Sequence, residues 1–227
     1  MRLLGVETSS PIFSVAIFEG GRVLSSVRIE GTGRPSALLA DLIQQAAASA
    51  GLGLKELDGF AVSIGPGSFT GLRVGVMTVK TLAWALKKPV LPVSSLEVIA
   101  QNLKSFPQPV GLFLDARKAK VYGALFSPNG PGRLKRLTED RLMPPEEALR
   151  GFPDRTILVG DGLKRYGELA RSLRGETVSF APEESGIPSA ESLCLLAAER
   201  WPAGKVDDPH RLVPKYLYSL ESDITGH

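Results

Sequence analysis

The stretch that determines the fold spans residues 60–75 and reads Phe-Ala-Val-Ser-Ile-Gly-Pro-Gly-Ser-Phe-Thr-Gly-Leu-Arg-Val-Gly. Its first five residues form a short apolar run that is typical of a buried β-strand. Three glycines and Pro66 then interrupt this run, and apolar residues at helical spacing continue from Leu72 to Leu86. The stretch therefore predicts a strand that enters a helix through a tight glycine turn, which is an α/β unit.

Upstream of this unit the sequence predicts an antiparallel start. Strand-like runs occupy residues 3–6, 13–18 and 23–29, and the pair Gly20-Gly21 is typical of a hairpin turn. A helix with Ser36 as its N-cap follows and extends to Ala50. Downstream, we expect a strand over residues 90–93 and a helix over residues 95–103.

The opening of the chain recurs 108 residues later. The matching pairs at this offset are Val6 with Leu114, Glu7 with Asp115, Ala16 with Ala124, Ile17 with Leu125 and Phe18 with Phe126. Residues 158–162, Leu-Val-Gly-Asp-Gly, likewise repeat the strand and Gly-x-Gly turn of residues 62–67. A duplicated lobe is therefore expected. With the Pro107-Gln108-Pro109 segment as the boundary, the predicted domains are residues 1–106 and 107–227, both α/β.

Composition excludes several classes of protein. The chain has 227 residues, 43% apolar residues and a net charge of +3, which indicate a globular fold rather than disorder. The two histidines near the C-terminus and the single Cys194, which lies in a leucine-rich run, argue against zinc sites and catalytic triads. We expect a cytoplasmic protein that does not contact membranes and whose cysteine lies in the core.

Two polar turns are candidate phosphate sites. Gly65, Gly67 and Ser68 could bind an anion at the start of a helix, although glycines that only shape the turn explain the same pattern better. Glu7, followed by Thr8 and Ser9, and Asp115 could hold Mg²⁺ and a nucleotide phosphate as in an ATPase. The alternative is that Glu7 and Asp115 are structural acids at the ends of strands.

The helix predicted over residues 72–86 has more apolar surface than one contact requires. Its charged residues Arg73 and Lys80, together with Lys87, recur every seven positions, and apolar residues cover most of the remainder. Gly71 and Gly75 thin one side, so that another helix can approach closely. The pattern indicates a surface for a partner, and the alternative is a helix buried entirely in its own domain.

The chain resembles the TsaB (YeaZ) family of bacterial proteins over most of its length. The resemblance rests mainly on the eleven residues 65–75. Supporting motifs are Glu7-Thr8-Ser9, Pro-Val-Ser-Ser-Leu at 92–96, Asp115-Ala116-Arg117 with Val121-Tyr122, and Pro-Lys-Tyr-Leu at 214–217.

This resemblance implies a duplicated actin-like ATPase fold, related to ribonuclease H, and a role in making threonylcarbamoyladenosine on tRNA. It implies a non-catalytic scaffold that binds and activates the transferase TsaD together with the ATPase TsaE, and that contacts tRNA through this complex. The first two helices would form the TsaD contact, or a homodimer when TsaD is absent. The expected interface residues are Leu39, Ile43, Leu72, Arg73, Gly75, Val76, Val79, Lys80 and Ala83. No cofactor is expected, although the subunit contact leaves room for a nucleotide.

The sequence departs from the family pattern at informative positions. Residues 34–39, Arg-Pro-Ser-Ala-Leu-Leu, lack the histidine pair that holds the metal of TsaD, so no metal site is expected. Glu7 replaces a common aspartate and Tyr218 a common arginine. The alternatives to the scaffold are an ATP-binding phosphotransferase or ATPase that uses the cleft between the lobes, the older glycoprotease label, and a plain RNA-binding module.

Overall fold

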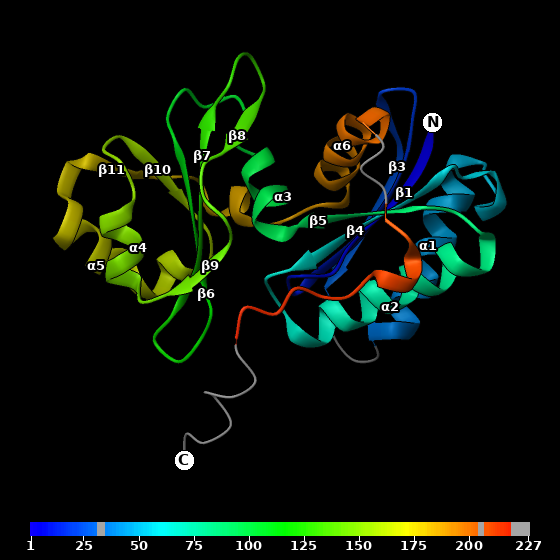
Figure 1. The fold of residues 1–227 in the computed structure, drawn as a ribbon, viewed down its shortest axis with the longest axis horizontal. Coiled ribbons are helices and arrows are strands. Elements are labelled where there is room, and N and C mark those ends of the chain that lie inside the picture. The colour runs from blue at the N-terminus through cyan, green and yellow to red at the C-terminus, as the bar shows by residue number, and fades with distance from the viewer. Residues whose placement is uncertain (31–34, 204–206, 219–227) are drawn as a thin grey trace. The chain divides into compact units, whose positions relative to one another are not determined.

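The computed structural model describes residues 1–30, 35–203 and 207–218, and the chain forms two compact units (Figure 1). Unit 1 comprises residues 1–98 and 188–215, and unit 2 comprises residues 99–187 and the chain from residue 216 onward. A single boundary near Pro107 was expected, but the chain returns to unit 1 because helix α6 (Ala190–Arg200) packs on its sheet. No helix in the described ranges is long and apolar enough to cross a membrane.

Unit 1 is built on a five-stranded sheet with the order β3-β2-β1-β4-β5. The strands are β1 (Arg2–Glu7), β2 (Ile12–Glu19), β3 (Arg22–Glu30), β4 (Gly59–Gly65) and β5 (Val90–Ser94). β1, β2 and β3 form an antiparallel meander, whereas β4 and β5 run parallel to β1. The meander predicted from the sequence is therefore confirmed.

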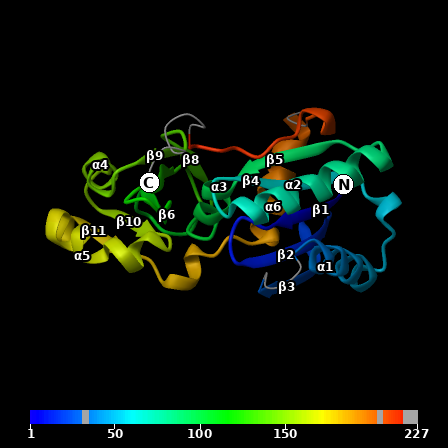
Figure 2. The same ribbon diagram turned by 90° about the horizontal axis from the view of Figure 1, so that it is seen from below.

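Helices cover both faces of this sheet (Figure 1). Helices α1 (Pro35–Ala50) and α2 (Phe69–Leu86) pack on one face and lie side by side in Figure 2. Because successive strand residues point to opposite faces, Leu4 of β1 joins the core under α1 and α2, whereas Leu3 packs against α6. The remaining helical segments of unit 1 are α3 (Ser95–Gln101), which crosses into unit 2, and the 3-10 turns η1 (Leu54–Glu56), η4 (Trp201–Ala203) and η5 (Pro209–Arg211).

Cys194 lies in the core between α6 and the sheet, as predicted. Its side chain is fully buried, and its thiol donates a weak hydrogen bond to the Ala16 carbonyl at 3.8 Å. Burial, with a smaller contribution from Glu191, raises the pKa of the Cys194 thiol to about 12. The thiol is therefore protonated at neutral pH and inert.

Unit 2 repeats the topology of unit 1. Its sheet has the order β11-β10-β6-β7-β8, with β9 paired to β7. The β6–β7 and β7–β8 pairs are antiparallel, and β10 and β11 run parallel to β6. The expected duplicated actin-like α/β fold of two lobes is confirmed. The elements of unit 2 are β6 (Val110–Asp115), β7 (Val121–Pro128), β8 (Leu134–Arg136), β9 (Arg141–Met143), α4 (Pro145–Gly151), β10 (Thr156–Val159), α5 (Gly162–Arg174), η2 (Gly175–Thr177), β11 (Val178–Phe180) and η3 (Glu183–Gly186).

The two repeats differ by one residue in the pairing of their first two strands, β1 with β2 and β6 with β7. Glu7 at the end of β1 pairs with Ser14, whereas Asp115 at the end of β6 pairs with Val121. The offset is 108 for the acids (115−7) but 107 for their partners (121−14). The sequence pairs Ala16 with Ala124, Ile17 with Leu125 and Phe18 with Phe126 are therefore one position out of register, because five residues separate Asp115 from its partner whereas six separate Glu7 from its partner.

The starts of α1 and α2 differ slightly from the sequence prediction. α2 begins at Phe69, three residues earlier than expected, because the Ser68 side chain accepts a hydrogen bond from the Gly71 N–H at 3.2 Å and caps the helix. α1 begins at Pro35, so Ser36 lies within its first turn and is not the N-cap that was predicted. Such one- to three-residue differences leave the faces of both helices unchanged.

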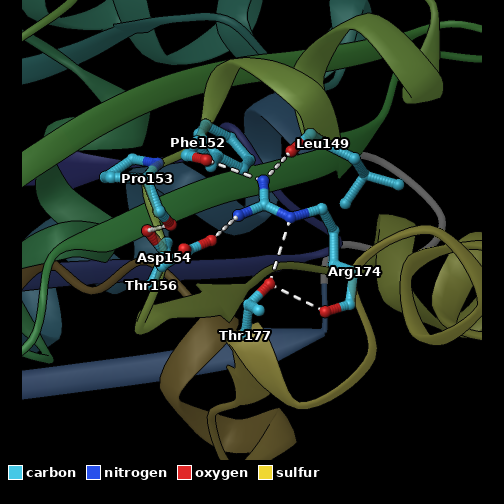
Figure 3. A network of polar contacts seen from close by, with 7 residues as sticks. All are labelled: Leu149, Phe152, Pro153, Asp154, Thr156, Arg174 and Thr177. Carbon is cyan, nitrogen blue, oxygen red and sulfur yellow. Dashed lines mark hydrogen bonds and ion pairs between the residues drawn. The ribbon is translucent and has the colours of Figure 1, made fainter.

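Arg174 at the end of α5 joins three segments of unit 2 (Figure 3). Its guanidinium donates to the Leu149 carbonyl and to the Phe152 carbonyl, the latter at 2.7 Å, and it pairs with Asp154 at 2.8 Å. The Nε of Arg174 also donates to the Thr177 hydroxyl at 3.2 Å. With its side chain only 12% exposed, one planar cation satisfies the carbonyls at the end of α4 and fixes the connection to β10.

We predict that Arg174→Lys lowers the free energy of unfolding by about 2 kcal/mol, because one ammonium cannot reach all four acceptors and leaves buried carbonyls unpaired. Chemical denaturation of the full chain measures this change. Arg171→Lys is the matched control, since Arg171 lies on the same helix, is 62% exposed, pairs with Glu168 and lies over the Phe180 ring. Equal losses in the two variants would contradict the prediction.

Candidate functional site

The outer side of α2 carries three large apolar side chains that unit 1 leaves exposed. Phe69, Met77 and Trp84 are 57%, 56% and 62% exposed. Arg73 lies between them with its guanidinium 4.6 Å from the centre of the Phe69 ring, a cation–π contact that keeps the ring and the charge together. We call Phe69, Arg73, Met77 and Trp84 the α2 face.

Helical periodicity places these four residues on one stripe. They follow one another at intervals of four, four and seven residues, which return to the same side of an α-helix. The opposite side of α2 belongs to the core of unit 1, and its buried residues are Gly71, Leu72, Gly75, Val76, Val79 and Ala83. α2 thus has two apolar sides, of which its own unit covers one.

The structure corrects which residues of the first two helices are accessible. Seven of the nine interface residues expected from the sequence are buried in unit 1: Leu39, Ile43, Leu72, Gly75, Val76, Val79 and Ala83. Of the other two, Arg73 is exposed on the α2 face, and Lys80 is half-buried. The buried seven face the sheet because they form the stripe that closes the core, so they cannot contact another subunit without unfolding unit 1.

Lys80 forms hydrogen bonds with the C-terminal segment of its own chain. Its ammonium donates to the carbonyl oxygens of His210 and Leu212 at 3.0 and 3.1 Å, and Leu212 is buried against the core under α2. The next residue, Val213, is 64% exposed. The charge of Lys80 therefore anchors the segment around η5 beside α2, and this segment borders the α2 face.

An open cavity of about 710 Å³ lies at the C-terminal end of α2. Its side walls include Trp84, Lys87 and Lys88 from α2 and the residues after it, and Asp207 and His210 from the anchored segment. An antiparallel bridge joins Asp207, one of the lining residues, to Val90. Trp84 is thus shared between the α2 face and this cavity.

Glu7, a candidate phosphate-site residue, is completely buried at the end of β1. Its carboxyl accepts hydrogen bonds from the Ser63 hydroxyl and from the Ser9 N–H, the latter at 2.7 Å. Burial raises the pKa of Glu7, and these hydrogen bonds offset only part of that effect. A buried acid with a raised pKa suits a structural role better than the binding of Mg²⁺.

The glycine loop before α2 is bonded to the β1–β2 turn and to the first turn of the helix. The Ser68 N–H donates to the Ser9 carbonyl at 2.7 Å, and the Leu72 N–H donates to the Ser68 carbonyl at 2.8 Å. Gly65 and Gly67 have φ values of 111° and 159°, and a Cβ on Gly67 would lie 2.3 Å from the Ser9 carbonyl oxygen. The loop is thus a turn that permits close packing, which is the alternative favoured from the sequence.

Thr8 fills the space in front of α2. Its hydroxyl donates to the Gly71 carbonyl at 2.8 Å, and a Cβ on Gly75 would lie 2.1 Å from that hydroxyl oxygen. Because the Glu7-Thr8-Ser9 turn packs directly on the helix, it leaves no room there for a phosphate.

Asp115, the second candidate acid, lies at the end of β6 in unit 2. Its carboxylate accepts a hydrogen bond from the Arg117 N–H at 2.9 Å. The same carboxylate lies 3.6 Å from the Arg117 guanidinium and 4.0 Å from the Arg165 guanidinium. This carboxylate is therefore already paired with two arginines of its own unit. Among the described residues, no group of three or more His, Cys, Asp or Glu side chains could hold a metal ion.

Phe69, Met77 and Trp84 were not among the site residues expected from the sequence. The signal that identifies them is the spacing of Arg73, Lys80 and Lys87, because charged residues every seven positions mark the outward side of a helix. Apolar residues on that same stripe must also point outward. The prediction instead named apolar residues of α2 that line the core, namely Leu72, Val76, Val79 and Ala83.

Comparison with known proteins identifies the relatives of the chain. Residues 34–199 match the family model for TsaD, the tRNA N6-adenosine threonylcarbamoyltransferase. The chain is 27% identical to the tRNA threonylcarbamoyladenosine biosynthesis protein TsaB of Bacillus subtilis, with 98% of this chain and 96% of that protein covered. TsaB of Escherichia coli is 26% identical, with 96% and 94% covered.

Solved structures agree with these relatives. The crystal structure titled YeaZ from Pseudomonas aeruginosa has a TM-score of 0.84 and 29% identity, with 95% of this chain and 99% of that chain covered. Both units therefore have counterparts in a protein of known structure. The chain belongs to the TsaD family and, within it, to the TsaB (YeaZ) group, whose role is the biosynthesis of threonylcarbamoyladenosine on tRNA.

Proposed function

We propose that this chain is a non-catalytic subunit that binds TsaD through the α2 face and activates it together with the ATPase TsaE. The observation that carries the proposal is the exposure of Phe69, Met77 and Trp84 on one side of a helix whose other side is already buried. Removing such side chains from water yields about 1.5–3 kcal/mol each before the costs of association. Aromatic residues with an adjacent arginine are also the usual energetic centre of a protein interface.

The family relationship supports TsaD as the partner. The chain matches the TsaD model over most of its length, so TsaD is a paralogue with a related fold. The same surface would pair two copies of this chain when TsaD is absent. TsaE would then act on the assembled pair.

We predict that Met77→Asp weakens binding to TsaD about thirtyfold or more, because it places an unpaired charge in an apolar contact. The stability of the isolated chain should change by less than about 0.5 kcal/mol, since Met77 is exposed in unit 1. Titration calorimetry with purified TsaD measures the first quantity and thermal unfolding the second. Leu137→Asp is the control, an equally drastic change at a 49% exposed site in unit 2. If the Met77→Asp variant bound TsaD as tightly as the parent chain, the α2 face could not be the TsaD-binding surface.

Activation is tested by reconstitution. Transfer of the threonylcarbamoyl group to unmodified tRNA should depend on adding this chain to TsaD and TsaE, and the Met77→Asp variant should fail to support it. The measurement is the amount of modified adenosine formed per TsaD. Full transfer in reactions that lack the chain would refute the activating role.

The alternative is an ATPase or phosphotransferase that uses Glu7 and Asp115. It requires nucleotide turnover by the isolated chain that Glu7→Ala or Asp115→Ala abolishes. The burial of Glu7, the packing of Thr8 against α2 and the two arginines beside Asp115 all favour the scaffold instead.

Glu7 offers a separate test through pH. The folded chain holds the Glu7 proton more tightly than the unfolded chain does, because burial raises the pKa of this carboxyl above its ordinary value. Its contribution to stability is therefore complete below that ordinary value and declines as pH rises toward the folded-state pKa. Each pH unit within this window costs about 1.4 kcal/mol.

Glu7→Gln should remove this decline, since an amide can accept from the Ser9 N–H and donate to the Ser63 hydroxyl without a titrating proton. We expect the variant to become progressively more stable than the parent chain as pH increases from about 4.5. Urea unfolding across the pH range measures the difference. Parallel stability profiles would show that Glu7 is charged in the folded chain.

A further inference from the structure

The turn between β6 and β7 has an unusual backbone. Arg117, Lys118 and Ala119 have φ values of 64°, 47° and 52°, and the Lys120 N–H closes the turn by donating to the Arg117 carbonyl at 2.9 Å. The left-handed conformation costs a residue with a side chain about 1–2 kcal/mol, and tight hairpin turns prefer Asn-Gly for this reason. Three successive residues with side chains therefore occupy positions that favour glycine.

The C-terminal segment holds this turn in place. The Tyr218 hydroxyl donates to the Ala116 carbonyl at 2.7 Å, and the Arg117 carbonyl lies 3.3 Å away. The ring of Tyr218 lies 5.5 Å from the Lys120 ammonium and meets the ring of Tyr122 edge-on at 6.4 Å. Two separate sequence motifs, Asp115-Ala116-Arg117 and the tail that ends in Tyr218, thus form one structure within unit 2.

This structure presents a concentration of positive charge. The Arg117 side chain is 86% exposed, Lys118 is exposed, and Arg165 from α5 is 54% exposed. Arg117 and Arg165 lie 3.6 and 4.0 Å from the Asp115 carboxylate, and the carboxylate of Asp161 accepts from the Asp115 N–H at 2.9 Å. Lys120 lies beside the ring of Tyr218, so cations and an aromatic ring occur together at this turn.

We propose that this turn, residues 117–120 with Arg165 and Tyr218, binds the phosphate backbone of RNA. Guanidinium and ammonium groups on a fixed turn bind phosphate oxygens, and adjacent aromatic rings suit an unpaired base or a ribose. The choice of RNA over an acidic protein rests on the role of the TsaB group in tRNA modification and on these rings. The site is separate from the α2 face and does not depend on binding to TsaD.

The test measures binding of unmodified tRNA to the full chain alone, by fluorescence anisotropy at several salt concentrations. The double variant Arg117→Gln/Lys120→Gln should bind at least about tenfold more weakly at 0.1 M salt, and the slope of log K against log[salt] should fall by about 2, one for each lost phosphate contact. Arg133→Gln/Lys135→Gln is the matched control, because it removes two exposed cations from the same unit. The control should keep the slope of the parent chain.

The Tyr218→Phe variant distinguishes the effect of positioning the turn from the effect of its positive charge. It removes the hydroxyl that fixes the turn but keeps every cation, so affinity should fall several-fold while the salt slope stays unchanged. Thermal unfolding of each variant confirms that the chain is folded. A slope that changes with Tyr218→Phe would overturn the positioning role of Tyr218.

Three results would overturn the proposal itself. They are no binding of tRNA by the parent chain at about 50 mM salt, equal losses in the two double variants, and tighter binding of polyglutamate than of tRNA, which would indicate an acidic protein partner. Met77→Asp should bind tRNA like the parent chain. Failure of the α2 docking surface and failure of this RNA site are therefore distinguishable.

Discussion

The close contact between the β1–β2 turn and α2 is the constraint on which unit 1 depends. Gly71 and Gly75 have no Cβ, so the Thr8 carbonyl and hydroxyl approach the helix to distances at which any other residue would collide. The hydrogen bond that the Thr8 hydroxyl donates to the Gly71 carbonyl fixes the rotation of α2 about its axis. Once this rotation is fixed, Val76 and Ala83 must enter the core, and Met77 and Trp84 must point outward.

The same contact fills the turn that the sequence offered as a candidate phosphate site. The turn that could hold a phosphate is occupied by the protein's own backbone, and its acid, Glu7, is bonded to Ser63 and Ser9. The outer side of α2 and the β6–β7 turn of unit 2, in contrast, carry exposed side chains.

Periodicity and turn chemistry predicted most of the architecture. The meander, the strand that enters α2 and the duplicated lobe all follow from patterns that a single sequence contains. The burial of Cys194 follows in the same way, from its leucine-rich neighbours. The site was harder to predict, because a list of apolar positions does not show which stripe of a two-sided helix faces the sheet. The spacing of Arg73 and Lys80 indicates the outward stripe, and the Thr8 contact explains why Val76 enters the core while Met77 stays outside it.

Other features depend on contacts between distant segments. α6 follows unit 2 in the chain, yet it belongs to unit 1, because Leu193 and Cys194 fill the second face of that sheet. The one-residue slip between the repeats depends on the register in which β7 pairs with β6, and the attachment of Tyr218 to the turn between these strands spans about a hundred residues. Local sequence patterns carry no information about such pairings.

The burial of Cys194 has a practical consequence for studies in solution. A thiol with a pKa of about 12 and no exposed surface should not react with maleimides or iodoacetamides while the chain is folded. A second cysteine introduced on the surface would therefore be the sole labelling position, without replacement of the native one. Two such introduced cysteines, one in each unit, could carry spin labels or fluorophores that report the distance between the units.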